Sequence, residues 1–256
     1  MPFVDTHCHL TSDELYSDLP GVSRRARDAG VMRMITVATD EADSRRAIAV
    51  ADHYQGVYAT VGVHPHEAAK VRPDDWASLR ELKHNPNVVA WGEIGLDYHY
   101  DFADKKTQKD VFAIQLAIVG GADLPIVIHC RDAVADGHAM LEQHGFRDRK
   151  VVFHCFSGTE AEADVIIERG WWLSFTGMVT FKNATGLQKI ARRYPPEQLM
   201  LETDSPYLTP EPHRKVRPNE PALVVHTAAR LAELKRVTLG EIERLTTENA
   251  VRFFGL

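Results

Sequence analysis

The sequence predicts an α/β fold, a single-domain (β/α)8 TIM barrel with an extra C-terminal helix. Short runs of β-branched and aliphatic residues alternate eight times with longer segments of helical periodicity, which indicates a closed parallel sheet. A chain of 256 residues suits one such barrel, and no Pro/Gly/Ser-rich linker marks a domain boundary within 1–256. An open doubly wound sheet is the alternative, but no G-x-G-x-x-G turn follows the first expected strand.

Each expected strand is a short aliphatic run, and each expected helix repeats its apolar residues at helical spacing. The strands are expected at 2–7, 32–38, 57–63, 88–94, 125–129, 150–154, 171–175 and 198–204. The helices are expected at 21–29, 41–53, 74–84, 105–121, 132–144, 159–168, 183–193 and 219–235. The extra helix is expected from Thr238 to Phe253, because Thr238 and Glu241 form a capping-box pattern at its start.

The charge balance argues against a protein that coats nucleic acid through a broad basic surface. The 30 basic and 36 acidic residues give a formal net charge of −6, which is compatible only with a local positive site. No apolar run approaches the roughly 18 residues of a membrane helix, and the N-terminus lacks a secretion signal. Three cysteines suit a reducing compartment. We therefore expect a cytoplasmic protein without membrane contact, and nothing indicates an obligate protein partner.

Side chains that bind metal ions stand at the C-terminal ends of five expected strands. The first strand ends in His7-Cys8-His9, and side chains two apart on a strand share a face, so both imidazoles can chelate one ion. The fourth, fifth, sixth and eighth strands end in Glu93, His129, His154 and Asp204. Each of them alone is more often an ordinary polar strand end. Together they lie where the active sites of such barrels form, which favours a metal centre.

Four imidazoles and two carboxylates exceed the needs of one tetrahedral ion and suit two divalent ions that share a ligand. Glu93 is the natural bridge, because a carboxylate can give one oxygen to each ion. Two-metal sites polarise a phosphoryl or carbonyl oxygen and lower the pKa of water, so hydrolysis is the expected reaction class. Imidazole-rich ligation favours Zn, Mn or Fe over Mg.

Six short motifs resemble those of a known family. They are Asp5-Thr-His7-Cys-His9-Leu10, Gly62-Val-His64-Pro65-His66, Gly92-Glu93-Ile-Gly-Leu-Asp97-Tyr98, Ile128-His129-Cys-Arg131, His154-Cys-Phe-Ser157-Gly158 and Glu202-Thr-Asp204-Ser-Pro206-Tyr207-Leu208. With these motifs the chain resembles the TatD-type metal-dependent deoxyribonucleases, which belong to the amidohydrolase-like barrels. The resemblance implies one ion held by His7, His9, Glu93 and Asp204, and a second held by Glu93, His129 and His154. The basic loop 212–221 departs from the family's pattern, because it has no glycine and is one residue longer.

The resemblance implies hydrolysis of phosphodiester bonds in DNA by water that two metal ions activate, with Glu93 as the bridging carboxylate and Asp204 as ligand and proton shuttle. Single-stranded DNA or frayed ends are the expected substrate, because the chain lacks the broad basic footprint of duplex binding. The residues do not separate a phosphoryl from an acyl centre, so an ester or amide hydrolase such as a D-aminoacyl-tRNA deacylase is the alternative. A metal-binding scaffold without catalysis would be marked by a broken ligand set, whereas all six ligand positions are filled here.

Further residues near the strand ends are candidates for substrate contact or for support of the ligands. The expected substrate-binding residues are His64, His66, Arg131, Tyr98 and Tyr207, and the two tyrosines are suited to stack on an unpaired base. Glu202 and Asp5 precede Asp204 and His7 by two residues, so they are expected to orient ligands from one layer deeper. A local basic run is either a solvated loop or a phosphate-steering patch: Arg214, Lys215 and Arg217.

Each of the three cysteines directly follows a histidine of a strand end, which makes them tempting zinc ligands. Strand alternation turns each cysteine away from the preceding histidine, towards the covering helices. We therefore expect small buried apolar residues at Cys8, Cys130 and Cys155.

Overall fold

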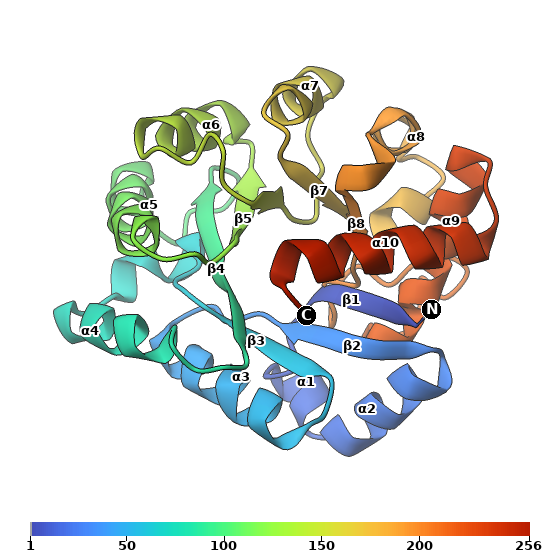
Figure 1. Cartoon of the computed structure of the whole chain (residues 1–256), viewed down its shortest axis with the longest axis horizontal. Coiled ribbons are helices and arrows are strands. Elements are labelled where there is room, and N and C mark those ends of the chain that lie inside the picture. Colours follow the sequence, from blue (N-terminus) through green and yellow to red (C-terminus); the bar gives the residue numbers. More distant parts are fainter. Residues whose placement is uncertain (1) are drawn as a thin grey trace.

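The computed structural model describes residues 2–256, which form a barrel of eight parallel strands surrounded by helices (Figure 1). Neighbouring strands in the barrel are neighbours in the chain, from β1 to β8. The strands are β1 Phe3–Cys8, β2 Val31–Thr36, β3 Val57–Val61, β4 Val88–Asp97, β5 Ile126–Arg131, β6 Val151–Phe153, β7 Trp172–Phe175 and β8 Leu199–Leu201. The predicted (β/α)8 TIM barrel is confirmed.

Helices connect the strands on the outside of the barrel (Figure 1). The α-helices are α1 Asp13–Tyr16, α2 Leu19–Asp28, α3 Glu41–His53, α4 Pro73–Leu82, α5 Lys105–Gly120, α6 Val134–Gln143, α7 Glu160–Glu168, α8 Thr185–Arg193, α9 Val224–Lys235 and α10 Leu239–Phe254. Short 3-10 turns are η1 Pro65–Lys70, η2 Gly177–Thr180, η3 Pro196–Gln198 and η4 Pro221–Leu223. Within residues 2–256, none of these helices combines the length and the apolar character needed to cross a membrane.

The barrel closes between β1 and the segment that follows β8. The amide of Asp204 donates to the carbonyl of His7 at 2.9 Å, and the amide of His9 donates to the carbonyl of Ser205 at 2.8 Å. A parallel bridge joins Cys8 to Ser205. Closure therefore lies next to the residues that the sequence predicts as metal ligands.

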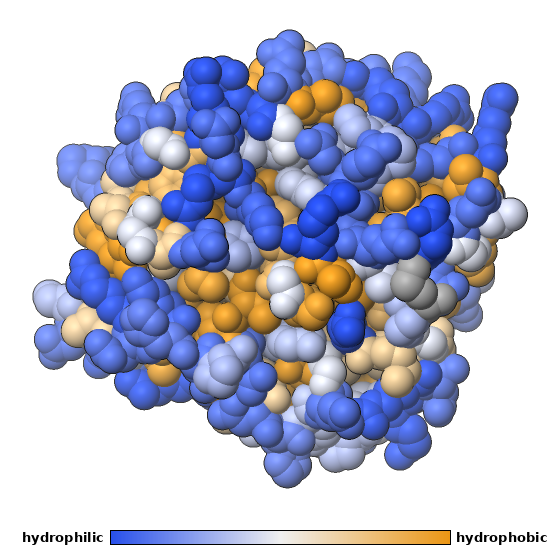
Figure 2. Space-filling view, viewed as in Figure 1, coloured by the Kyte–Doolittle hydropathy of each residue, from blue (hydrophilic) through white to orange (hydrophobic). Residues whose placement is uncertain are grey.

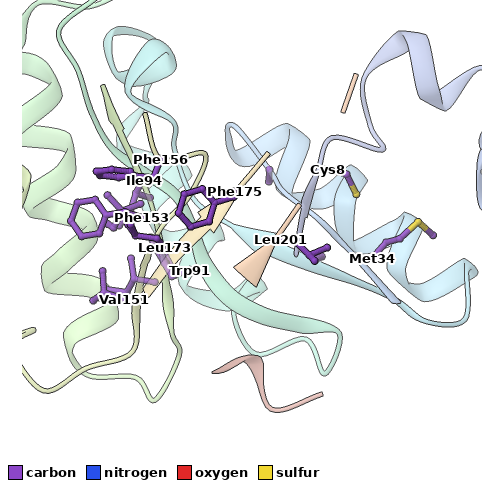
Figure 3. Packing of buried hydrophobic residues seen from close by; sticks show 14 of the residues in the cluster. Cys8, Met34, Trp91, Ile94, Val151, Phe153, Phe156, Leu173, Phe175 and Leu201 are labelled. Carbon is purple, nitrogen blue, oxygen red and sulfur yellow. The ribbon is translucent and has the colours of Figure 1, made fainter. Parts of the chain in front are cut away.

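The apolar residues form two layers on opposite faces of the barrel wall. The larger cluster lies between the sheet and the helices, and Figure 3 shows part of it, including Trp91, Phe153 and Phe175. The smaller cluster fills the inside of the barrel and includes Val127, Val152 and Met200. Alternation along each strand sends successive side chains to opposite layers, which is why both faces of the sheet are buried.

The predicted C-terminal helix is present as α10 and covers the N-terminal ends of the strands. Phe253 and Phe254 pack against the inner cluster, and the Phe253 ring lies 5.3 Å from that of Trp172. The Asn249 side chain donates to the carbonyl of Leu199, where β8 begins, at 2.8 Å. The predicted capping box is confirmed, because Thr238 Oγ1 accepts from the Glu241 amide and the Glu241 carboxylate accepts from the Thr238 amide.

Several strand boundaries differ from the expectation by a few residues, and two of these differences affect the site. β4 extends to Asp97, because a register shift between Trp91 and Ile94 lets residues 94–97 continue the ladder with β5. β8 ends at Leu201 instead of residue 204, because Asp204 adopts a left-handed φ of 54° and bonds to β1. The first helix after β1 and the 3-10 turn η1 were not expected.

Candidate metal centre

Glu93 lies at the centre of the predicted ligands and is almost completely buried. Its Oε2 is 3.3 Å from His7 Nε2. Its Oε1 is 2.7 Å from His129 Nδ1 and 2.5 Å from His154 Nε2. The two oxygens of one carboxylate therefore face two different groups of imidazoles.

His7, His9 and Asp204 form the group on the side of Glu93 Oε2. His9 Nδ1 lies 3.1 Å from the carbonyl of Val37, which fixes the ring and leaves Nε2 directed at Asp204 Oδ1, 3.4 Å away. His7 Nε2 is 3.7 Å from the same carboxylate oxygen. The left-handed turn at Asp204 brings its carboxylate to this position.

His129 and His154 form the group on the side of Glu93 Oε1, and each is also near a second buried carboxylate. His154 Nδ1 lies 3.4 Å from Glu202 Oε1, and His129 Nε2 lies 2.9 Å from Asp97 Oδ2. Carboxylates behind metal-binding imidazoles fix the ring orientation and make the ligand more basic. Glu202 and Asp97 occupy the positions at which such support is needed.

The sequence analysis missed Asp97. Its Oδ2 is shared between His129 and His66, and both Nε2 atoms lie at 2.9 Å. The signal was its position four residues after Glu93, since residues at even spacing on one strand share a face. The expected strand stopped at residue 94, so alternation was not extended to Asp97.

Asp5 and Glu202 are both held by hydrogen bonds on their oxygens. Asp5 accepts from the amide and the hydroxyl of Thr203, at 2.9 and 2.6 Å, which ties β1 to the segment that carries Asp204. Glu202 accepts from the Cys155 amide at 2.6 Å and from the Ser174 hydroxyl at 2.7 Å. These bonds locate both residues behind the central group instead of within it.

Burial and mutual charge shift the titration of the whole centre. Burial raises the pKa of Asp5 to about 7 and lowers the pKa of His64 to about 4. Burial opposes ionisation of Glu93, but His154, His64 and His7 around it hold its pKa well below the ordinary value. The centre thus stabilises an ionised carboxylate among imidazoles.

Unpaired nitrogens test whether this donor set fits a metal ion. Among the described residues, His7 Nδ1, His7 Nε2 and His154 Nδ1 are buried without a hydrogen-bond partner. Buried polar atoms rarely remain unpaired in a native protein unless an ion or water completes the site. The rings of His7 and His154 are stacked, with their centroids 3.9 Å apart. The donor set therefore fits a cation that binds imidazole and carboxylate.

Four groups of three side chains place potential ligand atoms within 4.8 Å of one another among the described residues. Two of them match the predicted sets: His7, His9 and Asp204, and Glu93, His129 and His154. The other two are His64, His66 and His129, and His7, His154 and Glu202. They are less suitable, because Asp97 already engages His66, and both oxygens of Glu202 already accept hydrogen bonds.

The predicted substrate residues fall into different places. His64 Nε2 is 3.4 Å from Glu93 Oε1, so it belongs to the centre. Tyr207 is 58% exposed at the rim, with its ring 6.2 Å from that of His9. Tyr98 instead turns outward and donates to Asp136 of α6 at 2.6 Å, so the structure does not bring it to the centre. The side chain of Arg131 lies over the ring of Tyr100.

The basic run of the 212–221 loop is partly engaged within the protein. The guanidinium of Arg214 lies over the Phe181 ring, and Arg217 donates to the Thr209 hydroxyl at 2.8 Å. The side chain of Asn219 is fully buried and donates to the carbonyl of Thr203 at 3.1 Å. The loop therefore braces the chain next to Asp204.

The cysteines lie outside the group of imidazoles and carboxylates. Cys8 packs in the outer cluster, as Figure 3 shows, and Cys130 contacts this cluster in front of Gly137 of α6. Burial raises the pKa of both thiols. Cys155 follows the end of β6, so strand alternation does not determine the direction of its side chain. Its sulfur lies 3.8 Å from the Thr176 hydroxyl.

Comparison with known proteins identifies relatives over the whole chain. The model of the family described as TatD related DNase matches residues 4–255. A protein of Bacillus subtilis strain 168, "Uncharacterized metal-dependent hydrolase YabD", is 41% identical over 250 residues, 98% of each chain. The "3'-5' ssDNA/RNA exonuclease TatD" of Cronobacter turicensis is 37% identical over 254 residues, 98% of this chain and 97% of its own.

A solved structure shows the same architecture. The crystal structure of YJJV, a TatD homolog from Escherichia coli K12, matches with a TM-score of 0.93 at 30% identity, over 99% of this chain and 98% of the other. Sequence and structure thus agree with the resemblance that the six motifs indicated. The chain belongs to the TatD-related DNase family and is a metal-dependent hydrolase.

Proposed function

We propose that the chain hydrolyses phosphodiester bonds in single-stranded DNA or frayed DNA ends, with two divalent ions at the C-terminal end of the barrel. The observation that carries this proposal is the position of Glu93, whose two oxygens face separate groups of imidazoles. The Cronobacter turicensis relative is named an exonuclease of ssDNA and RNA, which supports a nucleic-acid substrate.

Two ions would share Glu93 as a common ligand. We assign one ion to His7, His9, Glu93 and Asp204, and the other to Glu93, His129 and His154. When bound, such a pair polarises the scissile phosphoryl group, lowers the pKa of water and stabilises the leaving oxygen. The imidazole-rich donor set favours Zn, Mn or Fe over Mg.

The protein's own groups orient the ligands and handle the proton. Asp97 lies 2.9 Å from His129 Nε2 and Glu202 lies 3.4 Å from His154 Nδ1, so a carboxylate stands behind each ring and favours its orientation towards Glu93. Asp204 accepts the proton of the attacking water, because its carboxylate lies at the barrel mouth and its backbone is fixed to β1. His64 Nε2 lies 3.4 Å from Glu93 Oε1, and we assign contact with the leaving group to this imidazole.

Groups at the rim bind the strand outside the centre. Tyr207 is exposed beside His9 and is suited to stack on an unpaired base. Arg131 follows His129 by two residues on β5 and is suited to bind a phosphate oxygen.

We also propose that the protein acts in the cytoplasm. The three cysteines, all within the described residues, are free, which suits a reducing compartment.

The deciding experiment is metal analysis of the purified protein, followed by chelation and reconstitution with Zn, Mn, Fe or Mg. We expect two ions per chain, loss of activity on chelation, and cleavage of 3'-labelled single-stranded DNA after reconstitution. Glu93→Gln is expected to weaken the binding of both ions, while Glu241→Gln at the opposite end of the barrel serves as control. Two ions bound by Glu93→Gln at unchanged affinity contradict the bridge. Turnover of D-aminoacyl-tRNA without DNA cleavage contradicts the substrate.

A further inference from the structure

Two aromatic side chains are exposed in the loop between β4 and α5. Tyr100 is 43% exposed and Phe102 is 63% exposed, although most large apolar residues lie in the two buried clusters. Their rings contact His66 of η1, with centroids 5.5 Å and 4.6 Å from the imidazole. We call His66, Tyr100 and Phe102 the aromatic rim. Exposed aromatic rings in contact with each other are typical of a binding surface.

The aromatic rim is continuous with the metal centre. His66 Nε2 and His129 Nε2 both lie 2.9 Å from Asp97 Oδ2. The rings of His66 and His64 are 4.4 Å apart, and His64 faces Glu93. A group that rests on Phe102 therefore lies next to whatever occupies the centre.

The loop that carries the rim is braced although its rings are exposed. Asp97 Oδ1 accepts from the amides of His99 and Tyr100, at 2.9 and 3.0 Å. The side chain of Gln108 donates to the carbonyls of Asp97 and Ala103, at 2.8 and 2.9 Å. The loop is thus fixed at both ends before any ligand binds, which reduces the entropy cost of binding.

A cation accompanies the aromatic rings. The guanidinium of Arg131 lies 5.0 Å from the centroid of the Tyr100 ring. Within residues 2–256, no carboxylate pairs with Arg131, so its charge is available to a ligand. An apolar ring surface beside an available guanidinium matches a planar base attached to a phosphate.

We propose that the aromatic rim is the stacking site for the unpaired nucleobase next to the scissile phosphate, with Arg131 directed at a phosphate oxygen. This assignment rests on the nuclease activity proposed above and names the element that selects unpaired strands. A base within a duplex has both faces covered by its neighbours, so it must leave the stack before it reaches Phe102.

The kinetic test uses the metal-loaded full-length protein and two 3'-labelled oligonucleotides. One is an intact single strand, and the other carries abasic analogues at the terminal nucleotides of both ends. Phe102→Ala is expected to raise KM for the intact strand roughly 5- to 150-fold and to leave KM for the abasic strand unchanged. Phe102→Tyr keeps the ring and is expected to restore the KM. Met32→Ala, at another exposed apolar side chain near the start of β2, is the control.

A spectroscopic test reports stacking without turnover. A strand with terminal 2-aminopurine is bound to Asp204→Asn protein, which is expected to hold it uncut. Stacking quenches 2-aminopurine fluorescence, and adding Phe102→Ala is expected to remove the quenching. Equal KM changes for both strands, or quenching that survives Phe102→Ala, overturns the stacking site while the nuclease proposal stands. Wild-type protein that binds its metals and cleaves neither strand overturns both.

Discussion

The two ends of the barrel interior differ completely in chemistry, although the same strands build both. On the inward face of three strands, a step of two residues replaces an apolar side chain by a titratable one. The pairs are Val127 and His129, Val152 and His154, and Met200 and Glu202. Because side chains alternate with a period of two, both members of each pair point into the barrel. One strand therefore supplies a structural residue and a functional residue in succession.

The apolar end is closed by α10, and the polar end is left accessible. Figure 1 shows α10 across the barrel, and Figure 2 shows apolar surface in the middle of this same face, with hydrophilic residues around it. At the other end the carboxylates and imidazoles satisfy one another only in part, and among the described residues both nitrogens of His7 lack a hydrogen-bond partner. Stability is therefore concentrated at the α10 end of the barrel and reactivity at the opposite end. Substitutions at the two ends should separate these properties.

Asp204→Asn is expected to have the largest effect at the polar end. The amide keeps the shape and offers one oxygen to an ion, but it does not accept the proton of the attacking water. Loss of general-base help typically lowers the rate about 10²- to 10⁴-fold. The melting curve, metal content and cleavage of single-stranded DNA are measured on one preparation. If the variant is folded and metal-loaded and cleaves at nearly the wild-type rate, Asp204 is not the proton acceptor. His64 is then the next candidate.

Met200→Ala tests the apolar end of β8, two residues before Glu202. Removal of a fully buried side chain from the inner cluster is expected to cost about 2–5 kcal/mol of unfolding free energy. The rate per folded molecule and the metal content should stay near those of the wild type. Chemical denaturation gives the first quantity, and assays well below the melting temperature give the others. Loss of metal from well-folded Met200→Ala would show that the two ends are not separable.

Glu202→Gln is expected to affect both the metal centre and the stability of the barrel. Glu202 lies behind His154 and also joins the end of β6 to β7. An amide cannot accept from both the Cys155 amide and the Ser174 hydroxyl as the carboxylate does. We expect metal affinity to fall about 10- to 100-fold, as is common when a carboxylate behind a metal-binding imidazole is lost. Stepwise titration with a chelator should release first the ion assigned to His154. Release of both ions together, at the chelator concentration that the wild type requires, would contradict this expectation.

Thr238→Ala is expected to have the smallest effect, confined to the α10 end. It removes the side-chain acceptor of the capping box and should cost about 1 kcal/mol of unfolding free energy. Thr238→Ser keeps the acceptor and is the control. Thermal unfolding monitors the loss, and DNA cleavage should not change in either variant. If Thr238→Ala changes DNA cleavage and Thr238→Ser does not, the N-terminal end of the barrel influences the site, contrary to this expectation.

Sequence reasoning succeeded where a residue's role depends on its own strand. The aliphatic runs before His129 and His154 predict both the strands and the side to which the imidazoles point, and the structure has them there. Thr238 and Glu241 likewise predict a cap from residues three apart. Such local patterns need no knowledge of distant neighbours.

Tyr98 and Asp97 show where this reasoning fails. The Glu93 strand was expected to end at residue 94, and alternation turns Asp97 inward and Tyr98 outward only because β4 continues to Asp97. That continuation depends on pairing with β5, whose partner residues lie some thirty positions later in the chain. A strand boundary placed three residues early was enough to hide Asp97.

The sequence by itself determined the barrel, the extra helix and which strands carry imidazoles and carboxylates, because period-two alternation and capping act over a few residues. Only the tertiary structure decided how those groups meet. It placed the two oxygens of Glu93 towards different imidazoles, put Asp97 between His66 and His129, and exposed Phe102 beside them. These arrangements join residues 31 to 86 positions apart in the chain, and only closure of the barrel brings such residues into contact.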